Sequence, residues 1–178
     1  PAELKLGITT FNSGSASVFG VPARQAADMM AEQINARGGI GGVPVKLFTP
    51  ADYDGVIQGL LGGTLDYAWL GASAYAKIYL TDPEAVEVKL TKQNLDGSTG
   101  YYSIGFARKD AGIASMDDAK GKIFAFADPN STSGYLVPGA ELTAKYGNLE
   151  EYFSEVKMSG GHEQTIVGVA NGDFDAGV

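Results

Sequence analysis

The stretch KIFAFADPNSTSGYLVPG, Lys122–Gly139, joins an apolar run to a polar loop and then to a predicted helix. A short apolar run followed by turn-forming residues predicts a buried strand that ends in a loop. Three hydroxyl side chains, Ser131, Thr132 and Ser133, stand side by side where the helix should begin. One hydroxyl is enough to cap a helix, so three of them indicate a cluster of hydrogen-bond donors at the strand's end.

The same alternation of strand and helix extends along the chain in both directions. Apolar runs predict strands at residues 4–11, 43–48, 64–71, 85–91, 101–107, 122–127, 155–159 and 174–178. Helical periodicity and stop signals predict helices at 21–37, 52–63, 73–80, 115–121, 133–146, 148–153 and 162–172. This order predicts an α/β fold of parallel, flavodoxin-like or Rossmann-like sheets with helices on both faces. The loop NLDGSTG interrupts the pattern, so we expect two lobes, residues 1–99 and 100–178.

Composition excludes several classes of function. The chain has 178 residues, of which 44% are apolar, so it can bury a core. Its net charge of −8 argues against a nucleic-acid partner, whose binding depends on lysine and arginine contacts to phosphates. It has no cysteine and one histidine, which leaves no thiol nucleophile and too few ligands for a zinc site. We expect no metal and no cofactor. No apolar run spans a membrane, and the first residues lack the pattern of a signal peptide, so the protein is cytoplasmic or its signal has been removed.

Polar side chains follow three of the predicted strands. Ser131, Thr132 and Ser133 follow one strand, His162 follows the next strand along the chain, and Tyr53 follows the strand at 43–48. Loops at the carboxyl ends of parallel strands lead into helix N-termini, whose free N–H groups and partial positive charge favour anions. These residues therefore predict a binding site for a small oxyanion, and this site would need no lysine or arginine.

Two other interpretations of these residues stay open. Ser131 or Ser133 could merely cap the helix, and a lone histidine is more often a surface or core residue than a ligand. A hydrolase would have to use Ser131 with His162, but no GxSxG elbow surrounds the serine. A non-catalytic binding site is the function that the pattern favours.

From Val43 onward the chain resembles the phosphonate and phosphite solute-binding proteins of ABC importers, a type II periplasmic binding family. The segments that carry the resemblance are VPVKLFTPADYDGVIQGL, LDYAWLGASAYAKI, FADPNSTSGYLVPGAEL and SGGHEQTIVGVANGDFDAGV. The resemblance implies two lobes that close over a phosphorus oxyanion without chemistry. It also implies that Ser131, Thr132, Ser133 and His162 hold the ligand's oxygens, with Tyr53 from the other lobe. The implied partners are the oxyanion and the importer's membrane subunits, and the implied location is the periplasm.

Residues 1–42 resemble a different group, the type I branched-chain amino-acid-binding proteins, in LKLGITTFNSGSASVFGVPARQAADMMAEQINARGGIGG. We therefore expect a junction near residues 42–45, a first lobe that is partly rebuilt, and a chain truncated at its C-terminal end. The alternative is that the chain is an engineered chimeric scaffold, expressed in the cytoplasm, that has kept no ligand binding. An unfinished first lobe would leave a sheet edge open, and a homodimer or strand exchange could follow.

Overall fold

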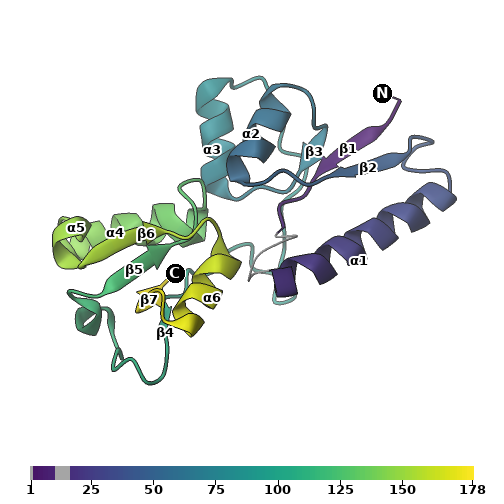
Figure 1. The fold of residues 1–178 in the computed structure, drawn as a ribbon. Helices are drawn as coiled ribbons and strands as arrows, with labels where there is room; N and C mark the ends of the chain where they lie inside the picture. The colour runs from purple at the N-terminus through teal and green to yellow at the C-terminus, as the bar shows by residue number, and fades with distance from the viewer. Residues whose placement is uncertain (1, 11–16) are drawn as a thin grey trace. The chain divides into compact units, whose positions relative to one another are not determined.

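The structure, a computed structural model, describes residues 2–10 and 17–178 (Figure 1). Contacts between Cα atoms divide the chain into two compact units, Pro1–Ala85 and Val86–Val178. Each unit has its own sheet, with strand order β2-β1-β3 in the first and β4-β7-β5-β6 in the second. The predicted α/β class is confirmed in both units. No helix in the described part of the chain is long and apolar enough to cross a membrane.

In the first unit, strands and helices alternate as predicted, and all strands are parallel. The elements are β1 (Leu4–Gly7), α1 (Ser17–Ala36), β2 (Val45–Phe48), α2 (Tyr53–Leu61), β3 (Tyr67–Ala68) and α3 (Ala72–Thr81). Helix α2 begins at a side-chain cap, because Asp52 accepts a hydrogen bond from the amide of Gly55 at 2.8 Å. Val56, Ile57 and Ile78 are buried where α2 and α3 cover the sheet.

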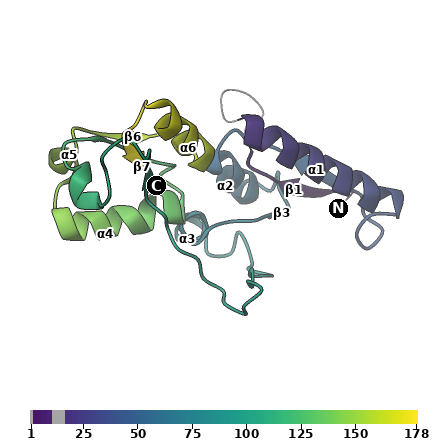
Figure 2. The same ribbon diagram turned by 90° about the horizontal axis from the view of Figure 1, so that it is seen from below.

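The second unit contains the hydroxyl-rich stretch Lys122–Gly139. Its elements are β4 (Phe106–Ala107), η1 (Met116–Ala119), β5 (Ile123–Phe126), η2 (Thr132–Leu136), α4 (Val137–Tyr146), α5 (Leu149–Tyr152), β6 (Glu155–Met158), α6 (His162–Asn171) and β7 (Ala176–Gly177). Strand β5 is parallel to both of its neighbours, and β4 is an antiparallel edge strand. Figure 2 shows α4 and α6 on opposite faces of this sheet, which is the predicted arrangement.

Aromatic rings form the core of the second unit. Phe124 and Phe126 on β5 are each 1% exposed, and Phe153 is 2% exposed. The ring of Phe124 stacks on Phe153 at a centroid distance of 4.7 Å and meets Phe126 edge to face at 5.1 Å. Burying one such side chain stabilises a protein by about 1.5–3 kcal/mol. The core therefore anchors β5, the strand that leads into the hydroxyl-rich loop.

One predicted strand is absent, and several are shorter than predicted, among them 64–71, of which only Tyr67 and Ala68 form β3. Residues 85–91 form no strand, and of residues 101–107 only Phe106 and Ala107 join the sheet. Both segments have the alternating pattern of strands, but a strand is stable only when a neighbour pairs with it. The turn between them forms as predicted, with the Asn94 amide donating to the carbonyl of Ser98 at 2.7 Å.

Candidate functional site

The two loops that carry the predicted donors meet at one edge of the second sheet. Strands β5 and β6 pair in parallel, with Phe126 opposite Met158, so their carboxyl ends lie together. The pairing continues beyond the strands, since the amide of Ser159 donates to Phe126 and that of Gly160 to Ala127, each at 2.8 Å. Ser131 and His162 are brought into contact in this way.

Ser131 both caps a helix and contacts the histidine. Its hydroxyl accepts a hydrogen bond from the amide of Gly134 at 3.0 Å, and it lies 3.1 Å from Nε2 of His162. The side chain is almost completely buried, and the Ser131 carbonyl accepts from Leu136 five residues later, which makes a π turn. The capping interpretation of Ser131 is therefore confirmed, and it does not exclude the role in binding.

The tautomer of His162 decides what the Ser131 hydroxyl can offer a ligand. If Nε2 of His162 carries a proton, Ser131 accepts from both His162 and Gly134 and keeps its own O–H for a third partner. If Nε2 carries no proton, the Ser131 hydroxyl donates its only proton to Nε2 and has none left for another partner. Only the arrangement with a proton on Nε2 of His162 leaves the Ser131 hydroxyl free to donate to another group.

Gly134 is a site residue that the sequence analysis missed. A Cβ atom there would lie 2.5 Å from Cβ of Ala127, 2.8 Å from Cε1 of His162 and 2.9 Å from Oγ of Ser131. Contacts this short do not occur, so only glycine lets the π turn approach the histidine ring. The signal available in the sequence was a glycine directly after three hydroxyl residues, at the second position of the predicted helix.

A second set of hydroxyl groups holds the turn before His162. Ser159 Oγ lies 2.9 Å from the carbonyl oxygen of Gly161 and 2.7 Å from Oγ1 of Thr165, and Thr165 Oγ1 lies 3.1 Å from the same carbonyl. Thr165 is fully buried and would collide with any side chain at Gly177, since a Cβ there would lie 2.4 Å from its Cγ2. The start of α6 is therefore packed directly on β7, and His162 has a fixed backbone.

The C-terminal end of α6 is contacted by the guanidinium group of Arg108. Nη1 of Arg108 donates to the carbonyl oxygen of Val169 at 2.8 Å, in the last turn of the helix. A positive charge at a helix C-terminus complements the helix dipole, whose positive end lies at His162. Arg108 therefore stabilises the helix whose first residue is in the candidate site.

The other two predicted hydroxyl residues lie in the same turn, half-buried. The carbonyl of Ser133 accepts a hydrogen bond from the hydroxyl of Ser103 at 2.5 Å. Among the described residues, none accepts a hydrogen bond from the amide of Ser133. Thr132 follows the cap residue directly, at the first position of the helical stretch that continues through α4. The turn therefore presents an N–H donor of the kind that binds anions at helix N-termini.

The charge nearest in sequence to this turn is negative. Asp128 is buried, and its Oδ1 accepts from the amide of Asn130 at 2.7 Å. Two helices begin within the site, one at Thr132 and one at His162, and their N-termini supply partial positive charge. The electrostatic attraction for an anion would therefore come from main-chain dipoles and hydroxyl groups.

Tyr53 belongs to the first unit, where it is the first residue of α2 and half-buried. It follows the end of β2, as predicted. Ser131 and His162 lie in the second unit, and the structure describes each unit by itself. The role of Tyr53 in ligand binding therefore stays a prediction.

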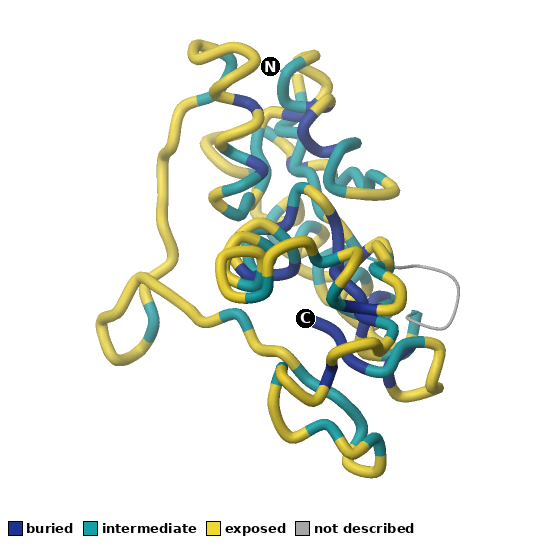
Figure 3. The backbone as a smooth tube through the Cα atoms, turned by 90° about the vertical axis from the view of Figure 1, so that its left-hand side faces the viewer, coloured by how far each residue is buried: buried dark blue, intermediate teal, exposed yellow. Residues whose placement is uncertain are grey.

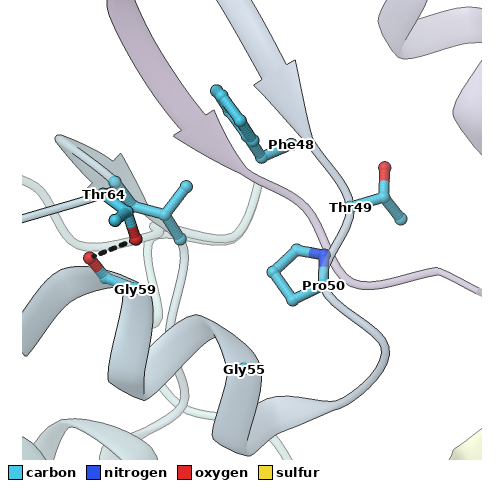
Figure 4. A pocket seen from close by; sticks show the side chains of 7 residues that line it. Phe48, Thr49, Pro50, Gly55, Gly59 and Thr64 are labelled. Carbon is cyan, nitrogen blue, oxygen red and sulfur yellow. Dashed lines mark hydrogen bonds between the residues drawn. The ribbon is translucent and has the colours of Figure 1, made fainter. Parts of the chain in front are cut away.

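A small hollow also lies at the end of β2 (Figure 4). Its lining residues carry no charge and are Phe48, Thr49, Pro50, Gly55, Gly59, Thr64 and Leu65. Gly55 and Gly59 allow α2 to pack closely here, because a Cβ at either would lie within 2.8 Å of Pro50 or Leu65. The hollow is a gap in the packing of the first unit and offers an anion no charged partner.

Solved structures define the class of the fold. A binding-protein component of an ABC phosphonate transporter from Pseudomonas aeruginosa superposes with a TM-score of 0.78 at 29% identity, over 98% of this chain and 55% of that one. A PhnD protein from Prochlorococcus marinus, solved with methylphosphonate, superposes with a TM-score of 0.77 at 23% identity and supports the fold alone. The fold is that of the substrate-binding proteins of ABC transporters.

Sequence comparison identifies the family within that class. The profile described as "ABC transporter, phosphonate, periplasmic substrate-binding protein" matches residues 22–178. The phosphate-import protein PhnD of Mycolicibacterium smegmatis is 32% identical over 167 residues, and the phosphonates-binding periplasmic protein of Escherichia coli is 37% identical over 138 residues. This chain belongs to the family of phosphonate periplasmic substrate-binding proteins.

The matches cover most of this chain but only part of its relatives. They span 88% and 75% of this chain, and 52% and 40% of the M. smegmatis and E. coli proteins. The chain therefore spans about half the length of these relatives. The family match begins at residue 22, so it includes residues 22–42, which the sequence analysis assigned to a different family. The expected junction near residues 42–45 is not confirmed.

Proposed function

We propose that this chain binds a small phosphorus oxyanion, of the phosphonate, phosphite or phosphate type, for an ABC importer. The observation that carries the proposal is the contact of Ser131 with His162 at two converging helix N-termini. Tetrahedral oxyanions accept several hydrogen bonds in different directions, and two hydroxyl-bearing loops with main-chain donors match that need. Family membership supports the same class of ligand.

The residues that we propose as ligands are Ser131, Thr132, Ser133 and His162 from one lobe, with Tyr53 from the other. The proposed lobes are residues 1–99 and 100–178. Ser133 can donate its amide and Ser131 its hydroxyl, once His162 donates to Ser131. Tyr53 would add a phenol donor from across the lobes. The proposed partners beyond the ligand are the membrane subunits of an importer, and the proposed location is the periplasm.

We propose no chemistry on the bound ligand. Ser131 and His162 are as close as a nucleophile and its base, but no GxSxG elbow surrounds the serine, whose hydroxyl caps the π turn. Among the described residues, no carboxylate is hydrogen-bonded to the ring of His162, so the third group of a catalytic triad has no candidate. The alternative of a chimera that retains no ligand has no support from the family match, which runs to residue 178.

Calorimetry with phosphite and methylphosphonate tests the proposal. We expect saturable binding that a Ser131→Ala, His162→Ala double variant abolishes, because it removes both side chains of the contact that carries the proposal. Ser98→Ala, in an exposed turn of the same unit, is the matched control and should bind as the parent protein does. Absence of heat at millimolar ligand, from protein whose circular dichroism shows it folded, would refute the proposal.

A further inference from the structure

A serine on the segment before β4 contacts the candidate site. Figure 3 shows the chain that leads into β4 as a long, mostly exposed stretch. Of residues 95–105, all of which the structure describes, Ser103 is half-buried and the others are exposed. The hydroxyl of Ser103 donates to the carbonyl oxygen of Ser133 at 2.5 Å, within the second unit. Ser103 is therefore turned toward the loop that carries the hydroxyl cluster.

The peptide group that Ser103 contacts is the one that binds Ser131. The carbonyl of Ser133 and the amide of Gly134 belong to a single peptide group. Its oxygen accepts from Ser103, and its N–H donates to the hydroxyl oxygen of Ser131 at 3.0 Å. That oxygen lies 3.1 Å from Nε2 of His162. Three successive contacts therefore join Ser103 to the histidine.

The donors of this chain can all point in the same direction. Ser103 donates to the peptide oxygen, and the peptide N–H donates to Ser131. When Nε2 of His162 carries a proton, Ser131 keeps its own O–H as the last donor of the chain. Hydrogen bonds in such a chain polarise one another, so each donor is stronger when the group behind it accepts a bond. The Ser131 hydroxyl thereby becomes a better donor.

The glycine at 134 makes the orientation of this peptide group depend on what holds it. Glycine populates positive and negative φ about equally, so a flip of the peptide group 133–134 has a low intrinsic cost. A flip would turn the N–H of Gly134 away from Ser131 and bring the carbonyl oxygen toward it. The bond from Ser103 to the carbonyl oxygen opposes that flip, because the oxygen would lose its donor.

We propose that Ser103 is a positioning residue of the oxyanion site. It fixes the peptide group 133–134 and, through it, strengthens the Ser131 hydroxyl as a donor. This role rests on the proposed function, because the group that receives the Ser131 proton is the phosphorus oxyanion. Ser103 itself needs no contact with the ligand, and its contribution is preorganisation of a residue that makes one.

The amide proton of Gly134 reports on this chain without any ligand. Loss of the bond to the carbonyl oxygen reduces the polarisation of the N–H in the same peptide group. We expect Ser103→Ala to move the Gly134 amide proton signal upfield in a nitrogen-15 correlation spectrum of the ligand-free protein. Ser103→Thr keeps the hydroxyl and should restore the signal. Ser154→Ala is the matched control, an exposed serine at the opposite end of β6 from the site, and should leave the signal unchanged.

Calorimetry with phosphite measures the consequence for binding. We expect Ser103→Ala to weaken binding by about 3- to 10-fold, as for one lost neutral hydrogen bond. Ser103→Thr and Ser154→Ala should bind as the parent protein does. A Gly134 signal that stays in place in Ser103→Ala, unchanged binding by that variant, or a loss that Ser103→Thr does not restore would overturn the proposal. A parent protein that binds no phosphite would overturn the proposed function instead, and the Gly134 signal would still decide whether the chain of hydrogen bonds forms.

Discussion

Oγ of Ser131 lies 3.1 Å from Nε2 of His162, although 31 positions separate the two residues in the sequence. The contact exists because β5 and β6 are parallel neighbours and each leads into a helix at the same edge of the sheet. A hydroxyl that caps one helix thereby meets the first side chain of another.

Substitutions of His162 distinguish its two ring nitrogens. The amide of glutamine can place a donor near the position of Nε2, whereas the shorter asparagine cannot reach Ser131. We expect His162→Asn to weaken oxyanion binding roughly 10- to 100-fold, because without the donor at Nε2 the Ser131 hydroxyl is no longer held to donate to the charged ligand. His162→Gln should lose much less. Calorimetry with phosphite measures both, and equal losses for the two variants would contradict the role of Nε2.

Gly134 should tolerate no side chain. Gly134→Ala forces Ala127, Ser131 or His162 to move, and we expect it to destabilise the protein by about 1–3 kcal/mol and to impair binding. Gly139→Ala, on α4, is the matched control, since its nearest neighbours would lie 3.9 Å away. The control should be neutral or stabilising by up to about 1 kcal/mol, because alanine favours helix. Urea denaturation measures both changes, and equal stability of the two variants would refute the steric argument.

Arg108 should stabilise α6 through its C-terminal carbonyl groups. Arg108→Met keeps the aliphatic contacts but loses the hydrogen bond to Val169, so we expect a loss of about 0.5–2 kcal/mol. Lys109→Met removes a charge from an exposed neighbour and should change stability little. Thermal unfolding measures the difference. A larger effect of the Lys109 change would show that net charge matters more than the position at the helix end.

The capping box at η1 should make stability depend on acid pH. The hydroxyl of Ser115, together with the amides of Ser115 and Ala114, holds the pKa of Asp118 below its ordinary value of 3.8. A folded-state pKa below the unfolded one means that the contribution is complete above pH 3.8 and is lost as the pH falls through the folded value.

We therefore expect Asp118→Asn to be less stable than the parent protein at neutral pH and equally stable well below pH 3.8. Urea denaturation at the two pH values checks this. Glu141→Gln, an exposed change on α4, controls for the removal of a surface charge and should show no such convergence. A difference that persists unchanged in strong acid would exclude the carboxylate as its source.

Local features of the fold were predictable because their causes are local. A capping box of Ser115 and Asp118 begins η1 within the predicted helix at 115–121, and Gly147 and Gly172 follow the last residues of α4 and α6. Capping, turn formation and helical periodicity depend on residues within a few positions of one another. The order of strands and helices, and hence the α/β class, follows from these signals alone.

Pairing of distant segments was not predictable in the same way. Residues 85–91 have the alternation of a strand but no partner in the described chain, so they form none. The need for glycine at 134 arises because Ala127, Ser131 and the ring of His162 all pack against the π turn. The sequence by itself determined that strands and helices alternate, and which donors follow β2, β5 and β6. The tertiary structure decided which strand ends are neighbours, because adjacency in a sheet depends on contacts across the whole domain that no local pattern contains.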